Sequence, residues 1–244
     1  MKIFHGVNFV KKESPWYHEE LLDPQYARDL QSWGLNVVRL GTMWSGLEPR
    51  EGEYDLEYVD TLKKIISNMR EEGVYVILDM HQDVVSQRYK TYDGFPDWLV
   101  EKLRSGSERV FPWPLASIEN WFCGYITYEV GFVFQSFYNN KVGALDKFAG
   151  VWRLIASEFR DVDNVLGYNI LNEPWAGNVY RDGGLVLPGE VMRQNLAPLY
   201  EKVNIAIREV DQDTLLFWEP PTWSHWGFNT NIPSLDKTII NYFK

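Results

Sequence analysis

The sequence of 244 residues is long enough for one or two domains with a large hydrophobic core. Its formal net charge of -10 argues against nucleic acid as a partner, because a phosphate backbone attracts a basic surface. We also expect no transmembrane helix, no signal peptide and no internal disulfide, since there is no run of 18 apolar residues, the first residues read directly as a strand, and Cys123 is the single cysteine.

Short apolar runs alternate along the chain with segments of helical spacing. The first predicted strand covers residues 3–10. The helix after it begins at Asp23-Pro24, an N-cap followed by proline at the first helical position, and ends at Trp33-Gly34. The second strand, 35–41, is apolar on both faces, which is typical of a parallel sheet covered on both sides.

The same alternation continues, with one long interruption. The further predicted strands are 74–80, 165–171, 213–220 and 238–243, and the further helices are 56–72, 143–159 and 191–210. Residues 84–140 show no clean alternation and are too long for a bare loop. We therefore expect an excursion at about 84–140, with short helices of its own, that lies over the ends of the strands.

This order of strands and helices favours one fold class. Parallel strands joined by long connections, with polar residues where the strands end, predict an α/β fold of the (β/α)8 TIM-barrel type in one domain over 1–244. A doubly wound open sheet is the alternative, but the glycine-rich phosphate motifs typical of that fold are absent from the sequence. About six of eight strands are found, so we expect an incomplete barrel.

The aromatic content is high, with 11 Trp, 14 Tyr and 13 Phe. Ten of these residues fall in loop-like segments: Trp16, Tyr17, Trp44, Tyr92, Trp98, Trp113, Trp121, Trp175, Trp223 and Trp226. They either belong to a large core or line a groove for ligands with an apolar face and a polar rim, such as sugars. The sequence leaves both interpretations open.

Polar side chains follow five of the predicted strands. They are Asn8 and Lys11, then Arg39, then His81 and Asp83, then Asn172 and Glu173, and finally Glu219. Each has a structural explanation by itself: an ion pair for arginine, a buried histidine, a helix cap for glutamate. Together they are hard to explain as packing, because buried polar groups cost free energy, and in a barrel they converge on one mouth.

Cleavage of a glycosidic bond is the chemistry that fits this set. It needs one carboxylic acid to protonate the leaving oxygen and one carboxylate to attack the sugar or activate water. Glu173 ends a buried strand, and the amide of Asn172 beside it could bind a sugar hydroxyl. A tryptophan such as Trp175 could stack on the sugar ring.

The ordered set of motifs resembles glycoside hydrolase family 5, and within it the endoglycoceramidase branch. The segments that carry the resemblance are Gly6-Val7-Asn8-Phe9-Val10-Lys11, Asn36-Val37-Val38-Arg39-Leu40-Gly41, His81-Gln82-Asp83, Asn172-Glu173-Pro174-Trp175 and Phe217-Trp218-Glu219-Pro220. The resemblance implies a retaining endo-β-glycosidase that cuts the bond between oligosaccharide and ceramide in glycosphingolipids. It implies no metal and no cofactor.

The resemblance also implies a role for each matched residue. Glu173 would be the general acid/base, with Asn172 as its sugar-binding neighbour. Arg39 and His81 would support the site, and Lys11 and Asp83 would bind the sugar, although Lys12 is an equal candidate for the lysine. Trp175 would contact substrate. Glu219 matches a residue at a strand end of the family and is not its nucleophile.

The chain departs from the family pattern at its end. The family barrel has eight strands and carries its nucleophilic glutamate after the seventh, whereas no glutamate follows Glu219 here, and Asp236 is wrongly placed before the sixth predicted strand. We therefore expect the N-terminal two-thirds of an enzyme. The alternatives are a β-glucanase or mannanase of the same family, a non-catalytic carbohydrate-binding remnant, and a truncated chain without a stable fold.

The expected partner is a glycolipid or oligosaccharide, with peripheral contact to lipid. A secreted or lysosomal-like location follows from the resemblance alone, and the sequence carries no signal for an oligomeric state.

Overall fold

The computed structural model describes residues 3–89, 94–106, 121–222 and 238–240. Its centre is a six-stranded parallel sheet in which the strands follow one another in sequence order. The strands are β1 (Gly6–Phe9), β2 (Val37–Thr42), β3 (Tyr75–Met80), β4 (Val165–Asn169), β5 (Leu215–Trp218) and β6 (Thr238–Ile240). The predicted parallel α/β sheet is therefore confirmed, with each strand near its predicted place.

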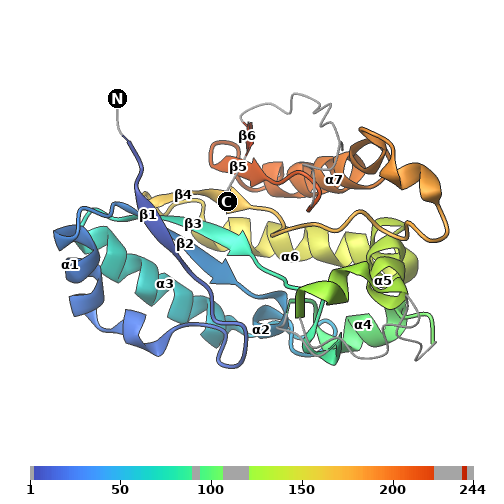
Figure 1. Cartoon of the computed structure of the whole chain (residues 1–244). Coiled ribbons are helices and arrows are strands. Elements are labelled where there is room, and N and C mark those ends of the chain that lie inside the picture. Colours follow the sequence, from blue (N-terminus) through green and yellow to red (C-terminus); the bar gives the residue numbers. More distant parts are fainter. Residues whose placement is uncertain (1–2, 90–93, 107–120, 223–237, 241–244) are drawn as a thin grey trace.

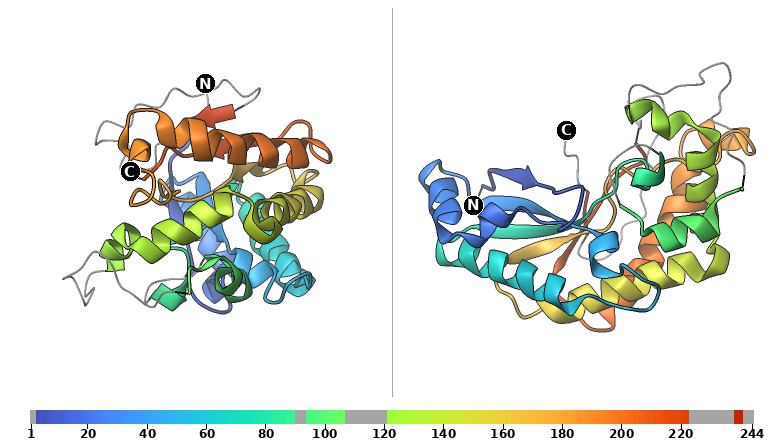
Figure 2. Two further views of the ribbon diagram at one scale, coloured as in Figure 1. Left: turned by 90° about the vertical axis from the view of Figure 1, so that its right-hand side faces the viewer. Right: turned by 90° about the horizontal axis from the view of Figure 1, so that it is seen from below.

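Seven α-helices are found in the described residues: α1 (Pro24–Ser32), α2 (Trp44–Leu47), α3 (Leu56–Glu71), α4 (Asp97–Leu103), α5 (Tyr128–Tyr138), α6 (Ala144–Phe159) and α7 (Ala197–Arg208). Short 3-10 or π turns form η1 (Glu19–Leu22), η2 (Gln87–Tyr89), η3 (Trp121–Ile126), η4 (Lys141–Gly143), η5 (Gly183–Val186) and η6 (Met192–Leu196). Helices α3 and α6 run along one side of the strands, and α4 and α5 lie beyond the carboxyl ends of β2 and β3 (Figures 1 and 2).

The helix ends follow the capping residues of the sequence. Asp23 accepts a hydrogen bond from the backbone N–H of Gln25 at 2.8 Å, and Pro24 occupies the first position of α1. Asp55 accepts in the same way from the N–H of Tyr58 at 3.0 Å and caps α3. Such caps satisfy N–H groups that have no partner inside the helix, which fixes where each helix begins.

The register of the sheet brings the strand ends to one level. In β2 to β5, Gly41 pairs with Asp79, Asp79 with Asn169, and Asn169 with Phe217. Since parallel strands point the same way, the residues that follow these positions leave the sheet along one edge. The predicted polar residues at the ends of β2 to β5 are therefore delivered to the same mouth.

The hydrophobic core accounts for part of the aromatic content. Trp44 is fully buried and packs against Phe95 and Phe148, with ring centroids 5.5 and 5.2 Å apart. Of the two interpretations left open for Trp44, the core is therefore the one that the structure shows, because the short helix α2 turns its side chain inward. Trp98 is half-buried and donates its indole N–H to the carbonyl of Glu48 at 2.9 Å.

Some of the other aromatic residues of the loop-like segments lie in the described part of the chain, and the rest do not. Trp16 and Tyr17 are partly buried and pack against the core. Tyr92, Trp113, Trp223 and Trp226 lie outside the described residues, as do the side chain of Trp121 and the residue Asp236.

Burial differs sharply between the centre of the sheet and its first strand. In β2 and β3 every residue after the first is buried, whereas three of the four residues of β1 are exposed. Val7, on β1, is 39% exposed. The sheet is therefore curved but not closed within the described residues, which agrees with the expectation of an incomplete barrel. No helix of the described segments is long and apolar enough to cross a membrane.

Candidate active site

Arg39 is the hub of a buried polar cluster at the carboxyl ends of β2 to β5. Its Nη2 donates to Asp79 Oδ1 at 2.7 Å, to Glu219 Oε1 at 2.9 Å and to Asn172 Oδ1 at 2.9 Å. Its Nε donates to Asn169 Oδ1 at 2.9 Å. The guanidinium therefore ties β2 to the ends of β3, β4 and β5 through side chains that are nearly all inaccessible to solvent.

A line of charges of alternating sign crosses the mouth from β5 to the loop after β1. His81 Nδ1 lies 2.7 Å from Asp79 Oδ2, and His81 Nε2 lies 3.1 Å from Asp83 Oδ2. Lys12 Nζ lies 2.6 Å from the same oxygen of Asp83. The line runs in the order Glu219, Arg39, Asp79, His81, Asp83, Lys12. Three acids and three bases balance, so burial of the network leaves no net uncompensated charge.

The charge on His81 depends on its two carboxylate neighbours. Burial by itself lowers the pKa of the imidazole, but the charges and hydrogen bonds of Asp79 and Asp83 outweigh it and raise the pKa to about 9. For Asp83, burial raises the pKa, but His81 and Lys12 together hold it below its ordinary value. At neutral pH the histidine is therefore an imidazolium between two carboxylates.

Glu173 lies beside this network but does not belong to it. Among the residues that the structure describes, none forms a hydrogen bond or ion pair with its carboxyl group. The side chain is half-buried, and burial raises the pKa of its carboxyl group, with a further contribution from the charge of Asp83. His81, Lys12 and Arg39 oppose this rise. A raised pKa favours the protonated form of the carboxyl group, and that form can donate a proton to a leaving oxygen.

Glu219 has the opposite environment at the end of β5. One carboxylate oxygen accepts from Arg39, and the other accepts from the backbone N–H of Glu173 at 3.0 Å. Burial raises the pKa of this carboxyl group to about 7, although the charge of Arg39 opposes the rise. These two contacts fix the orientation of the Glu219 carboxylate, and its role towards a sugar stays a prediction.

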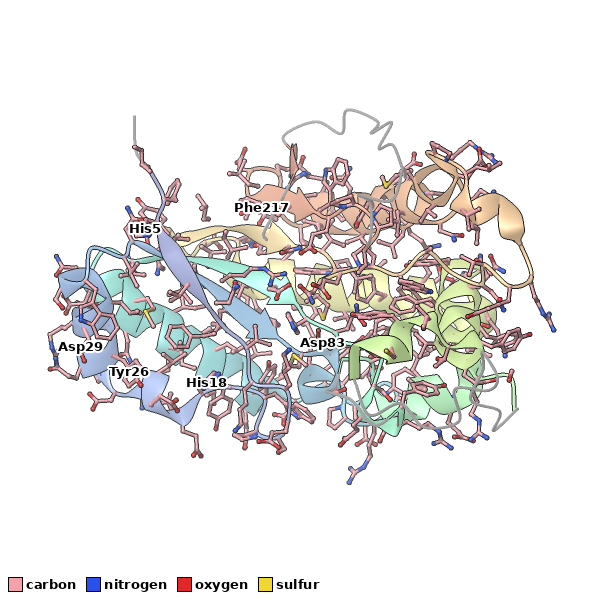
Figure 3. All side chains as sticks on the ribbon, viewed as in Figure 1. His5, His18, Tyr26, Asp29, Asp83 and Phe217 are labelled. Atoms are coloured by element: carbon pink, nitrogen blue, oxygen red, sulfur yellow. The ribbon has the colours of Figure 1, made fainter. Side chains whose placement is uncertain are left out.

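The structure places Lys12, rather than Lys11, beside the buried carboxylates of the mouth, and which lysine binds the sugar stays a prediction. Lys11 points to the exposed Glu13, with Nζ 3.1 Å from its carboxylate, whereas Lys12 reaches the buried Asp83. Residues adjacent in an extended segment face opposite ways, so only one of the two can enter the mouth. Figure 3 places Asp83 at the carboxyl end of β3, whereas His5 and Asp29 lie at the opposite end of the sheet.

Asn172 and Trp175 flank Glu173 and are held firmly. The amide of Asn172 accepts from Arg39 and donates to the carbonyl of Gln82 at 3.0 Å. Trp175 is 8% exposed and stacks on Tyr125 with ring centroids 5.5 Å apart. Both side chains therefore lie at the mouth, and their contact with sugar stays a prediction.

Three residues of the site were not selected from the sequence: Asp79, Asn169 and Gln82. Asp79 precedes His81 by two positions and Asn169 ends a strand, so alternation along the strands was an available signal for both. Gln82 donates its amide to the carbonyls of Asn172 and Glu173 at 2.7 and 3.0 Å. Its contact partners are 90 and 91 positions away, and no local pattern predicts them.

The described residues include no group of three or more His, Cys, Asp or Glu side chains arranged to hold a metal ion. The carboxylates of the mouth are instead neutralised by Arg39, His81 and Lys12. These side chains can transfer protons and stabilise charge.

The fold and the mouth define a class of protein, the parallel α/β-barrel type with carboxylates at its strand ends. The chain belongs to the cellulase family, glycosyl hydrolase family 5, whose profile matches residues 3–242. It is 35% identical over 270 residues to an endoglycoceramidase of Cyanea nozakii, across 99% of this chain and 53% of that protein. Endoglycoceramidase I of Rhodococcus hoagii (strain 103S) is 30% identical, across 91% of this chain and 44% of the relative.

Solved structures of an endoglycoceramidase are also similar to this chain. Endo-glycoceramidase II from Rhodococcus sp., as a lactosyl-enzyme intermediate, matches 98% of this chain with a TM-score of 0.79 and 25% identity, which covers 56% of that chain. The ganglioside GM3 complex of the same enzyme matches 98% with a TM-score of 0.78 and 26% identity, which covers 55% of that chain. The predicted family and TIM-barrel type are confirmed, and the chain spans about half the length of these relatives.

Proposed function

We propose that this chain carries the general acid/base, Glu173, of a retaining endo-β-glycosidase that separates the oligosaccharide from ceramide in glycosphingolipids. The observation that supports this role is the half-buried Glu173 carboxyl, with raised pKa and no hydrogen-bonding or ion-pair partner among the described residues. The substrate class is proposed from the relatives, which are named endoglycoceramidases, and from the neighbour complexed with ganglioside GM3.

In the proposed reaction Glu173 protonates the glycosidic oxygen as the bond to ceramide breaks, and later takes a proton from water. A retaining enzyme forms a covalent glycosyl-enzyme, and a lactosyl-enzyme intermediate is the state of one structural neighbour. The nucleophile is not assigned to Glu219, because its two oxygens already accept from Arg39 and from the backbone of Glu173. We assign it to a carboxylate outside the described residues.

The test is the release of glycan from lactosylceramide, measured by chromatography, for the parent chain and the Glu173→Gln variant. Loss of a general acid lowers the rate by about 10²- to 10⁴-fold. Glu48→Gln is the control, because Glu48 is a buried glutamate whose carboxylate accepts from Trp44 and Gly52 and lies outside the polar cluster of the mouth. An unchanged rate in Glu173→Gln contradicts the assignment. Cellulose and mannan, assayed in parallel, separate this function from a β-glucanase or mannanase.

A non-catalytic carbohydrate-binding protein is the second candidate. It is favoured by the engaged state of Glu219, which leaves Glu173 without a free carboxylate partner among the described residues. Calorimetry with lactose separates the two functions: binding with no glycan release from lactosylceramide supports the second, and turnover removes it.

A further inference from the structure

The backbone of Glu173 is strained. Its φ is +43°, in the left-handed region that residues with a Cβ rarely adopt outside special sites. Such a conformation persists only where surrounding contacts fix it, and it is common where a side chain must point in one functional direction. The contacts that fix Glu173 therefore determine where its carboxyl group points.

Gln82 makes two of these contacts from the end of β3. Its Nε2 donates to the carbonyl of Asn172 at 2.7 Å and to that of Glu173 at 3.0 Å, so one amide holds both sides of the strained residue. The side chain is completely buried, and the hydroxyl of Tyr125 lies 3.2 Å from the same nitrogen. Gln82 bears no charge, so this contact acts through geometry alone.

The other end of the Gln82 amide holds a second strained turn. Its Oε1 accepts from the backbone N–H of Val85 at 3.0 Å. Val84 and Val85 have φ values of +52° and +72°, and a left-handed backbone is unfavourable for β-branched residues in particular. Gln82 thus joins two strained segments, one after β3 and one after β4, through a single side chain.

Glu219 holds Glu173 from the opposite side. Its carboxylate accepts the N–H of Glu173 at 3.0 Å, and its own carbonyl accepts from the hydroxyl of Tyr200 at 2.6 Å. The N–H and C=O groups of Glu173 are therefore both held by side chains from the neighbouring strand ends, and the carboxyl group remains the part without a hydrogen-bonding partner among the described residues.

We propose that Gln82 is a positioning residue, which clamps the strained Asn172–Glu173 backbone so that the Glu173 carboxyl projects into the mouth in a partly water-excluded position. This deepens the proposed function, since it explains how the acid is placed. A residue with a purely structural role would change the stability of the fold and leave the titration of Glu173 as it is.

The experiment measures the titration of Glu173 in the folded chain by carboxyl ¹³C NMR, with the resonance assigned through Glu173→Gln. Gln82→Met removes the amide at similar side-chain volume. Gln82→Asn keeps an amide, but on a side chain too short to reach the carbonyls of Asn172 and Glu173. Neither substitution changes a charge. In both variants we expect the Glu173 pKa to fall measurably towards its ordinary value, because the released carboxyl gains water.

Tyr138→Phe is the matched control. It removes a buried hydrogen bond of 2.6 Å to the carbonyl of Trp175, only two residues beyond Glu173, and should lower stability without moving the Glu173 titration. A parent-like titration in the two Gln82 variants overturns the proposal, and so does an equal shift in Tyr138→Phe. A further check needs no variant: the Gln82 side-chain amide protons of the parent should exchange slowly with solvent, and rapid exchange also contradicts the clamp.

These readouts do not require turnover. A chain that releases no glycan from lactosylceramide still tests the clamp by titration, so failure of the proposed function and failure of the clamp are distinguishable. Where turnover is measured, Gln82→Met should lower kcat about 10-fold or more with little change in KM, as expected when an acid is displaced rather than a binding contact removed.

Discussion

The ends of β4 and β5 carry the same dipeptide but place it in opposite environments. Glu173-Pro174 and Glu219-Pro220 both put a glutamate directly before a proline where a buried strand ends. Glu219 is 8% exposed, and both of its carboxylate oxygens are engaged. The carboxyl of Glu173 has no hydrogen-bonding partner among the described residues and sits on a strained backbone.

The difference teaches which of two similar carboxylates can react. A carboxylate that accepts from an arginine and a backbone N–H is held in one orientation by charge-assisted hydrogen bonds. A half-buried carboxyl without such contacts costs stability but is ready to transfer its proton. One glutamate therefore stabilises the site, and the other is available for chemistry.

The largest expected effect comes from removing the residue that engages Glu219. Arg39→Met leaves Asp79 and Glu219 buried without their main cation, which should lower the free energy of unfolding by about 3–5 kcal/mol. Urea denaturation followed by circular dichroism measures this loss. Arg153→Met is the control, because Arg153 forms an exposed pair with Glu209 and should change stability by less than about 0.5 kcal/mol. Equal losses in the two variants contradict the buried network.

The second effect is a pH dependence carried by His81. The folded-state pKa of about 9 lies above the ordinary value of 6.5, so the stabilisation is complete below pH 6.5 and is lost as pH rises through 9. At about 1.4 kcal/mol per pKa unit the loss amounts to about 3 kcal/mol. The measurement is the stability of the parent minus that of His81→Gln between pH 6 and 10. A difference that stays constant over this range contradicts an imidazolium at the site.

The third effect sets the two glutamates against each other directly. Glu219→Gln should lower stability by about 1–3 kcal/mol, because an amide offers one acceptor to two donors. Glu173→Gln should raise stability slightly, because it removes a half-buried acid that has no partner among the described residues. Thermal melts of both variants measure these changes in stability. Melting temperatures that shift in the same direction in both variants would contradict the proposed difference between Glu173 and Glu219.

The smallest effect separates the two lysines. Lys12→Met removes one of the two cations on the buried Asp83 and should cost about 1–2 kcal/mol, whereas Lys11→Met should change stability by less than about 0.5 kcal/mol. The pair of variants is matched in sequence, and both are measured by urea denaturation. A larger loss of stability in Lys11→Met than in Lys12→Met would contradict the contact between Lys12 and Asp83.

The sequence predicted the helices and strands better than it predicted the contacts between side chains. Proline, glycine and aspartate marked the ends of α1 and α3, and apolar runs marked the strands, because these signals act over a few residues. The short helix α2 was missed, and with it the burial of Trp44, since four residues carry no helical periodicity.

For the site, the sequence by itself determined which residue types stand at the strand ends. Arg39, His81, Asp83, Asn172, Glu173 and Glu219 converge as predicted because parallel strands deliver their ends to one edge, and their roles on a sugar stay predictions. Only the tertiary structure decided that Lys12 enters the mouth, that Gln82 holds Glu173, and that one glutamate is engaged while the other is not. These outcomes depend on contacts between residues tens of positions apart, whose distances and burial are set by the packing of neighbouring strands.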